Sequence, residues 1–329
     1  MSTEVLCLSA DEVDRLLDID TAIDSQRAAF ASLARGTTSP AEKIMVPGGP
    51  DGSVAVCYAA RLSTETGPVC KFVSVNPANA RLGLPSISGV LMALDPETGR
   101  PVAIMDGAIV TAVRTAAASA AVADALATAQ STELAVLGSG VQGRGHVHAI
   151  CRVRPIREVR MWSRSEERRH RVARELASEL GLAVEPCASA EEAVRNADIV
   201  ATCTLSLEPV LRGAWLSPGT TVLSVGSFEP HRHEIDAAVI ERAAAVVIDD
   251  PATAARHAGP IVAAISEGRL GVDDLVSVGE VIVGRVRART SSEDVIYYNS
   301  TGLGVQDAAA CWAVIGRARA AGAGQTIAL

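Results

Sequence analysis

The stretch that most constrains the fold is a glycine-rich turn, LAVLGSGVQGRGH, which runs from Leu134 to His146. It places Gly138, Gly140 and Gly143 in the GxGxxG spacing, between an apolar run and a helix-compatible run. In such a unit the first glycine permits the turn, the second lets the backbone approach a pyrophosphate, and the third lets helix and strand pack closely. The amides at the start of the helix then face the phosphate charge. The turn predicts a dinucleotide-binding unit, against the alternative of a glycine turn that binds no ligand.

The end of the next predicted strand bears on the choice of cofactor. An NAD site usually carries an Asp or Glu there, about 20 residues after the glycines. Here the strand Glu158 to Trp162 is followed by Ser163 and Arg164, with no carboxylate. A guanidinium binds the 2′-phosphate of NADP through a planar fork, whereas a carboxylate would repel it. The sequence predicts NADP(H) as the preferred cofactor, with NAD(H) possible; the alternative is that Arg164 is an ordinary solvated surface charge.

From Thr132 onward the predicted strands and helices alternate, which is typical of βαβ units and a parallel sheet. Ligands lie at the carboxyl ends of such strands, which favours Thr202 to Ser206 and Gly226 to Phe228 as binding segments. The turn Asn299 to Gly304 is expected to approach the cofactor from the other side. Strands are expected at 134–137, 159–162, 182–185, 199–203, 221–225, 245–248 and 295–298, and helices from 142, at 166–180 and 190–195, and from 305.

The first part of the chain has a different pattern. A capping box at Ser9 to Glu12 opens one short helix, and Asp20 is expected to cap a second helix that ends at Gly36. Consecutive strands then predict an antiparallel or mixed sheet; they are expected at 54–58, 69–75, 87–94 and 102–105.

Two cations in this part have apolar surroundings. Lys71 shares a strand face with three valines, and Arg114 lies in an alanine-rich helical stretch with little other charge. A lone buried cation is very costly, so each is expected to meet an anion. That anion is either an internal carboxylate such as Asp106 or the carboxylate of a bound substrate.

Composition excludes some classes of function. The chain has 329 residues, enough for two domains, and a formal charge of −8, which argues against a nucleic acid or an anionic membrane as partner. Its start lacks the features of a signal peptide and its apolar stretches are too short and alanine-rich to span a bilayer, so a cytoplasmic protein is expected. The seven scattered cysteines predict reduced, buried thiols, and no cluster of residues predicts a metal site.

Several further motifs follow one another along the chain: Lys71 with Asn76–Asn79 and Gly83–Pro85, Asp95–Gly99, Met105–Gly107 with Thr111–Ala117, Gly138–Gln142, and Ser300–Gly302 with Gln306–Asp307. Through these motifs the chain resembles the ornithine cyclodeaminase/μ-crystallin family over essentially its whole length. The resemblance implies an α/β fold in which a Rossmann NAD(P)-binding domain, residues 121–299, is inserted into an α+β substrate-binding and dimerisation domain, residues 1–120 plus 300–329. It also implies a homodimer that acts on small amino or imino acids with a nicotinamide cofactor.

The resemblance implies roles for individual residues. Lys43, Lys71 and Arg114 are expected to hold the substrate carboxylate, with Lys43 in place of the family's Arg. Lys71 and Arg114 are the expected catalytic residues, and Phe228 and Thr301 are expected to contact substrate. The expected cofactor contacts are Ser86, Thr115, Gly138, Gly140, Val141, Gln142, Gly143, Ser163, Arg164, Thr204, Val225, Gly226, Ser227 and Ser300.

Two departures from the family bear on the reaction. Phe228 stands where ornithine cyclodeaminases carry an Asp, and no carboxylate occurs between Asp51 and Glu65, where those enzymes have a second acid. The sequence therefore predicts an NADPH-dependent oxidoreductase of the ketimine reductase or amino-acid dehydrogenase branch, which reduces a ketimine, a cyclic imino acid, or a 2-oxo acid plus amine. The alternatives are an ornithine or lysine cyclodeaminase with bound NAD, and a non-catalytic NADP-binding protein.

Lys71 is expected to donate a proton to the substrate, provided that burial or Arg114 lowers its pKa. Near Phe228, the residues Glu229, His231 and His233 either contact the substrate side chain or form a solvated loop.

Overall fold

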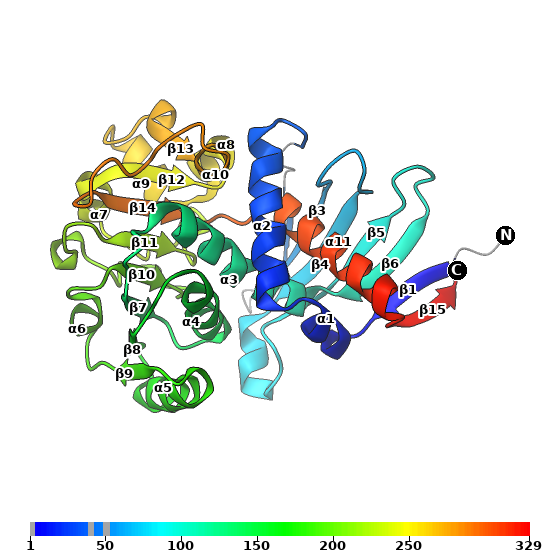
Figure 1. Cartoon of the computed structure of the whole chain (residues 1–329), viewed down its shortest axis with the longest axis horizontal. Helices are drawn as coiled ribbons and strands as arrows, with labels where there is room; N and C mark the ends of the chain where they lie inside the picture. Colours follow the sequence, from blue (N-terminus) through cyan, green and yellow to red (C-terminus); the bar gives the residue numbers. More distant parts are fainter. Residues whose placement is uncertain (1–3, 39–42, 49–52) are drawn as a thin grey trace. The chain divides into compact units, whose positions relative to one another are not determined.

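The computed structural model describes residues 4–38, 43–48 and 53–329. The chain divides into two compact units, Met1–Arg114 with Leu303–Leu329, and Thr115–Gly302, so it leaves the first unit once and returns to it (Figure 1). The first division falls inside helix α3 (Gly107–Leu126). The α/β class, with a parallel-sheet domain inserted into a mixed α and β domain, is confirmed.

The first unit contains a seven-stranded sheet. Its neighbours pair antiparallel except for β1 and β6, which are parallel, so the sheet is mixed. Strands β3 to β6 were predicted, whereas β1, β2 and β15 were not. Strands β2 and β15 are exposed at every position, so their sequences carry no buried face. In sheet order the strands are β15 (Gln325–Ala328), β1 (Glu4–Leu8), β6 (Pro101–Asp106), β5 (Ile87–Leu94), β4 (Val69–Val75), β3 (Val54–Ala60) and β2 (Ile44–Pro47).

Three helices accompany this sheet: α1 (Ala10–Leu16), α2 (Ile19–Ala34) and α11 (Gly304–Ala321), besides the short 3-10 helix η1 (Pro77–Leu82). The capping box of α1 is confirmed. The expected cap of α2 at Asp20 is wrong, because the side chain of Asp18 accepts the Thr21 N–H at 2.9 Å and Asp20 is already helical. Helices α2 and α11 lie side by side, and the Gln26 side chain donates to the Gln306 carbonyl at 3.1 Å (Figure 1).

The second unit contains an eight-stranded sheet in which every pair is parallel, as the alternating pattern predicts. In sheet order the strands are β13 (Leu275–Ser277), β12 (Ala243–Ile248), β14 (Val295–Asn299), β11 (Thr221–Ser224), β10 (Ile199–Thr202), β7 (Glu133–Leu137), β8 (Glu158–Trp162) and β9 (Ala183–Pro186). The helices are α4 (Val141–Val153), α5 (Glu166–Leu180), α6 (Ala190–Val194), α7 (Ala237–Arg242), α8 (Pro251–His257), α9 (Gly259–Ser266) and α10 (Val278–Ile282), with 3-10 turns η2 (Gly213–Trp215) and η3 (Val272–Asp274).

The carboxyl ends of the central strands lie in one row. Leu137, Thr202, Ser224 and Asn299 are register partners across β7, β10, β11 and β14. We call this row and the segments that follow each strand the carboxyl edge. Strand order reverses beside β7, where open α/β sheets bind ligands.

Two expectations about composition need correction. The apolar stretches were expected to be too short to span a bilayer, but helix α3 has 20 residues, because it begins at Gly107, and is long and apolar enough to cross a membrane. In its most apolar 18 residues, 61% of the helix is buried inside the protein, as in the core helix of a globular protein. Of the seven free cysteines only Cys187 and Cys311 are fully buried. Within the described ranges, no group of three or more His, Cys, Asp or Glu side chains is arranged to hold a metal ion.

Candidate functional site

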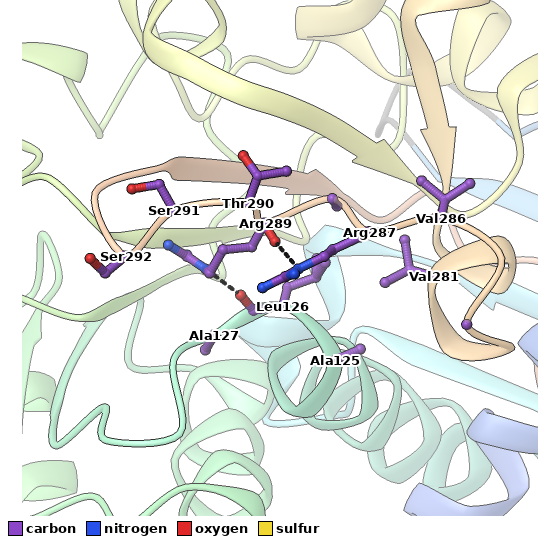
Figure 2. Close-up of a pocket in the computed structure, with 12 residues that line it drawn as sticks. Ala125, Leu126, Ala127, Val281, Val286, Arg287, Arg289, Thr290, Ser291 and Ser292 are labelled. Atoms are coloured by element: carbon purple, nitrogen blue, oxygen red, sulfur yellow. Dashed lines mark hydrogen bonds between the residues drawn. The ribbon is translucent and has the colours of Figure 1, made fainter.

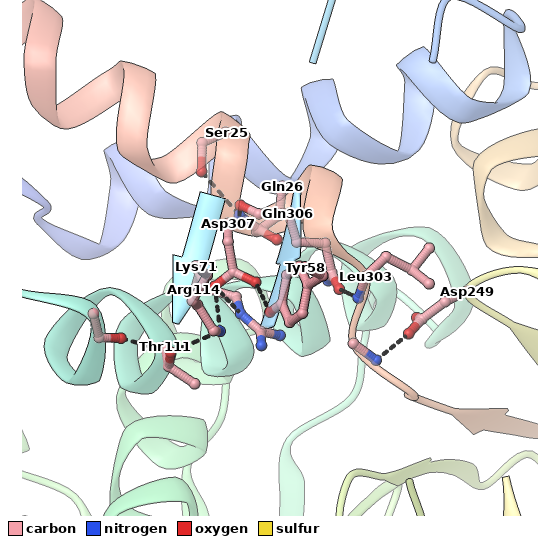
Figure 3. Close-up of polar contacts among 12 residues, drawn as sticks. Ser25, Gln26, Tyr58, Lys71, Thr111, Arg114, Asp249, Leu303, Gln306 and Asp307 are labelled. Carbon is pink, nitrogen blue, oxygen red and sulfur yellow. Dashed lines mark hydrogen bonds and ion pairs between the residues drawn. The ribbon is translucent and has the colours of Figure 1, made fainter. Parts of the chain in front are cut away.

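The first unit buries a cluster of charged side chains around Asp307 of α11 (Figure 3). Its Oδ1 accepts from Lys71 Nζ of β4 at 2.8 Å and from Arg114 Nε of α3 at 3.2 Å. Its Oδ2 accepts from the Tyr58 hydroxyl of β3. Lys71 Nζ also donates to Thr111 Oγ1 at 2.9 Å and lies 5.2 Å from the centre of the Tyr58 ring. Strands and helices far apart in the sequence thus hold two cations against one carboxylate.

The surroundings shift the charges of this cluster. Burial lowers the pKa of Lys71 to about 8; Asp307 opposes this effect, and repulsion from Arg114 adds to it. Burial raises the pKa of Asp307, but attraction to Arg114 and Lys71 outweighs it and brings that pKa to about 2. Near neutral pH Asp307 is therefore ionised, and Lys71 is protonated but close to its titration.

The partner of Lys71 and Arg114 is not the carboxylate suggested from the sequence. Asp106 instead accepts the N–H of Ile109 at 2.7 Å, at the start of α3. Lys43 is half-buried just before β2, and its positive charge contributes to the lowered pKa of Lys71.

In the second unit the glycine turn has the form that a dinucleotide site requires. Gly138 has φ +128°, and a Cβ there would lie 2.4 Å from the Cys203 carbonyl oxygen. A Cβ on Gly143 would lie 1.9 Å from the Gly138 carbonyl oxygen, so helix α4 starts too close to β7 for any side chain. Around Gly140 there is open space, and this N-cap of α4 has no side-chain capping bond. The backbone amides of the first turn of α4 and the open space beside Gly140 fit a pyrophosphate.

Other expected cofactor residues lie at the same carboxyl edge. Ser163 follows β8, and its hydroxyl is 2.8 Å from that of Ser139 in the glycine turn. Arg164 beside it is exposed, whereas Arg169 is 9% exposed and donates to the Ser163 carbonyl oxygen at 3.1 Å. Elsewhere Val141 is 71% exposed at the first turn of α4, next to the half-buried Gln142. Thr115 is buried on α3, and Ser86 is exposed just before β5 in the first unit.

Two buried carboxylates hold the remaining segments of the carboxyl edge. Glu234 accepts hydrogen bonds from Thr204 and Gly226, in a region that also includes Val225 and Ser227. Asp249 accepts the backbone N–H groups of Thr301 and Gly302 at 2.7 and 2.8 Å, directly after Ser300.

The segment around Phe228 is held by its own charges. The guanidinium of Arg232 lies 5.4 Å from the centre of the half-buried Phe228 ring and pairs with Glu229. Arg232 also donates to the Leu205 carbonyl oxygen at 3.1 Å, and His231 is mostly exposed, 3.6 Å from Glu229. Glu229 is thus engaged within its own loop.

A separate hollow of about 440 Å³ lies at the opposite, amino-terminal end of the sheet (Figure 2). Its floor includes Arg289, whose guanidinium donates to the Leu126, Gly219 and Asp294 carbonyls and to Thr221 Oγ1. Because these bonds tie three segments of chain together, Arg289 is structural, and the hollow lies apart from the expected cofactor residues.

Three residues that hold these sites together were not predicted from the sequence: Tyr58, Glu234 and Asp249. Asp307 belongs to a motif noted in the sequence but was not predicted to pair with Lys71. The signal for Asp307 was present, because it is a lone acid in an alanine-rich apolar helix, the same anomaly that drew attention to Arg114. Glu234 lies among other polar residues in the sequence, so nothing there distinguishes it.

Known proteins match this chain over nearly its whole length. Residues 3–322 match the model of the ornithine cyclodeaminase/mu-crystallin family. Among curated proteins, alanine dehydrogenase of Archaeoglobus fulgidus is 32% identical over 312 residues, which cover 93% of this chain and 92% of that protein.

Solved structures agree with this match. Delta(1)-pyrroline-2-carboxylate reductase of Thermococcus litoralis, solved in complex with NADH and L-proline, gives a TM-score of 0.94 at 27% identity and covers 98% of this chain and 100% of that one. An archaeal alanine dehydrogenase dimer with bound NAD gives a TM-score of 0.91 at 31% identity and covers 99% of both chains.

Proposed function

Since the chain belongs to the ornithine cyclodeaminase/mu-crystallin family, we propose that it is an NADPH-dependent oxidoreductase that reduces a 2-imino acid to an amino acid. The imine is cyclic, or forms from a 2-oxo acid and an amine. The observation that carries the proposal is the buried pair of cations, Lys71 and Arg114, at Asp307. Two proteins similar to this chain are named for such substrates: alanine dehydrogenase for an amino acid, and pyrroline-2-carboxylate reductase for a cyclic imino acid.

The charge of the cluster suits a carboxylate ligand. Lys71, Arg114 and the ionised Asp307 sum to one positive charge, and Lys43 adds to the positive potential at Lys71. Buried charge is stabilised by a counter-ion, and a substrate carboxylate supplies one. Arg114 offers the planar donor fork and Lys71 a point charge, which together orient the imine next to that carboxylate.

Lys71 also has the properties of a proton donor. A pKa of about 8 leaves its ammonium protonated at neutral pH yet acidic enough to give up a proton. In the reduction, Lys71 Nζ protonates the imine nitrogen, which becomes the amine nitrogen of the product. Asp307 and Thr111 hold Nζ in position through hydrogen bonds of 2.8 and 2.9 Å. The nicotinamide cofactor, when bound, supplies the hydride for the imine carbon.

The preference for NADPH is supported at the end of β8. Ser163 and Arg164 stand there without a carboxylate, and the buried Arg169 adds a second positive charge beside Ser163. A 2′-phosphate there would meet the exposed guanidinium of Arg164 rather than an acid, with the positive charge of Arg169 nearby.

Cyclodeamination of a diamine is disfavoured by the segment after β11. Phe228 offers an aromatic ring where a distal amine would need a base, and Glu229 is paired with Arg232. A non-catalytic binding protein would have no need of an ammonium held near its titration point. A cyclodeaminase and a non-catalytic binding protein would each give a different result from an imine reductase in the assay described below.

A second copy of the chain is proposed to cover one face of the seven-stranded sheet, the face on which the exposed Phe72 lies. Side chains on that face form a row across β2 to β5, in which Ile44, Phe72 and Val90 are 63%, 56% and 47% exposed. Exposed apolar rows of this kind mark interfaces. The similar archaeal alanine dehydrogenase was solved as a dimer.

The test combines cofactor binding with turnover. NADPH and NADH are titrated separately against the purified protein, followed by cyclic 2-carboxy imines, pyruvate with ammonia or methylamine, and ornithine or lysine. The proposal expects tighter NADPH binding, with NADPH consumed stoichiometrically by at least one imino acid.

Other results reject it in distinct ways. Release of ammonia from ornithine or lysine without net change of a tightly bound NAD identifies a cyclodeaminase. Binding of NADPH without turnover of any carboxylated imine identifies a binding protein, and a lower Michaelis constant for NADH than for NADPH overturns the cofactor preference alone.

A further inference from the structure

Glu234 is fully buried in the second unit, beneath the ends of two neighbouring strands. Its carboxylate accepts five hydrogen bonds, all from neutral groups. Oε1 accepts from the backbone N and the hydroxyl of Thr204, at 2.6 and 2.8 Å. Oε2 accepts from Gly226 N at 2.6 Å, Thr202 Oγ1 at 2.9 Å and Ser224 Oγ at 3.1 Å. One side chain therefore joins the end of β10 and its following segment to the end of β11 and its following segment.

The backbone of Glu234 is fixed as firmly as its side chain. Its N–H donates to Ser227 Oγ at 3.0 Å, and its carbonyl accepts from the N–H groups of Val210 and Leu211, each at 2.9 Å. The carboxylate thus stands on a rigid support and fixes the segments above it.

The contacts require a carboxylate. Each oxygen receives one backbone N–H, from Thr204 or from Gly226, and a backbone N–H can only donate. A glutamine in either orientation would turn its NH2 group toward one of these N–H groups. Burial raises the pKa of Glu234, and the hydrogen bonds from Thr204, Thr202 and Gly226 offset only part of that rise.

The segments that follow β10 and β11 are also in close backbone contact. A Cβ on Gly226 would lie 1.6 Å from the Thr204 carbonyl oxygen, so the backbones touch at the point where Glu234 joins them. Thr204, Gly226 and Ser227 belong to the expected cofactor contacts, and all three hydrogen-bond directly to Glu234.

We propose that Glu234 is a positioning residue for the nicotinamide cofactor: its carboxylate fixes Thr204 and Gly226 in the arrangement that binds the cofactor. This inference rests on the proposed function, because it needs a cofactor at the carboxyl edge. Glu234 itself need not touch the cofactor.

The test is Glu234→Gln, with the dissociation constant for NADPH measured by fluorescence titration and the Tm by thermal unfolding. An unmatched buried donor at Thr204 or Gly226 should raise the dissociation constant by about tenfold or more. In turnover, the KM for NADPH should rise while the KM for the imine stays within twofold.

Asp198→Ala is the matched control. Asp198 also accepts two backbone N–H groups, from Thr132 at 2.7 Å and Glu133 at 3.0 Å, but at the opposite edge of the same sheet. It should lower the Tm and leave the NADPH dissociation constant unchanged. Equal weakening in both variants, or no weakening in Glu234→Gln, overturns the inference.

A milder variant covers the case in which Glu234→Gln does not fold. Ser224→Ala removes one donor to Oε2 and should raise the NADPH dissociation constant about threefold; an unchanged value overturns the inference. If the unaltered protein binds neither NADPH nor NADH, the proposed function itself fails, so the two failures are distinguishable.

Discussion

Lys71 lies in a buried site where its proton is held by a balance of opposing effects. Burial is the largest of them and lowers its pKa to about 8, although Asp307 pulls the other way. In the proposed mechanism the protonated form of Lys71 is the proton donor, so kcat/KM should be constant below pH 8 and fall about tenfold per pH unit above it. Rates with saturating NADPH between pH 6 and 10 measure this.

Lys71→Arg is the control for that profile. Arginine keeps the positive charge but does not titrate in this range, so the break near pH 8 should disappear along with most of the activity. A break that persists in Lys71→Arg, or a flat profile in the unaltered protein, contradicts the role of Lys71.

Of the three charged residues in the cluster, two stand out in the sequence as anomalies. Lys71 and Arg114 were singled out because cations are rare among apolar neighbours. Asp106 was the carboxylate suggested as their internal partner, and Asp307, 193 residues beyond Arg114, was not paired with them. Helix α11 returns to the first unit after the whole inserted domain, and only that return brings Asp307 to Lys71.

Among the elements, the turn between β7 and α4 depends on two glycines for different reasons. Gly143→Ala would place a Cβ 1.9 Å from the Gly138 carbonyl oxygen, so it should destabilise the protein by roughly 3 kcal/mol. At Gly140 the surrounding space is open, so Gly140→Ala should keep the Tm within a degree or two yet weaken NADPH binding. Thermal unfolding and NADPH titration of both variants measure the difference.

Two results would contradict these roles of the glycines. If Gly140→Ala binds NADPH as tightly as the unaltered protein, the pyrophosphate does not lie against that glycine. If Gly143→Ala unfolds at the same temperature as the unaltered protein, β7 and α4 are less closely packed than the structure describes.

Most strands that bury side chains were predictable from the sequence, and fully exposed edge strands were not. Strands β4 and β5 fall on the predicted residues because β4 alternates buried and exposed positions and turn residues bound both strands. Strands β2 and β15 are exposed at every position, so they have no such pattern and form only as edges of a sheet. The cap of α2 was misplaced by two residues, because Asp18 and Asp20 are both plausible caps in the sequence.

For the whole molecule, the exposed apolar row on the first sheet predicts the state of assembly. Phe72→Glu puts a charge at the centre of that row, between Cys57 and Val90 in register. The variant should sediment as a monomer at concentrations where the unaltered protein is a dimer, since an unpaired charge in an interface is costly. Exposed Leu205→Glu, in the second unit, is the control and should stay dimeric. A monomeric unaltered protein contradicts the prediction.

In the proposed function, Lys71 and Arg114 bind the carboxylate of an imino acid. The most direct measurement is kcat/KM for NADPH oxidation with Δ1-pyrroline-2-carboxylate and with Δ1-pyrroline, which has the same ring and imine but no carboxylate. We predict a ratio on the order of a thousand in favour of the carboxylated imine, because orientation and charge pairing both depend on that group. Equal rates with the two imines would show that Lys71 and Arg114 do not bind a substrate carboxylate.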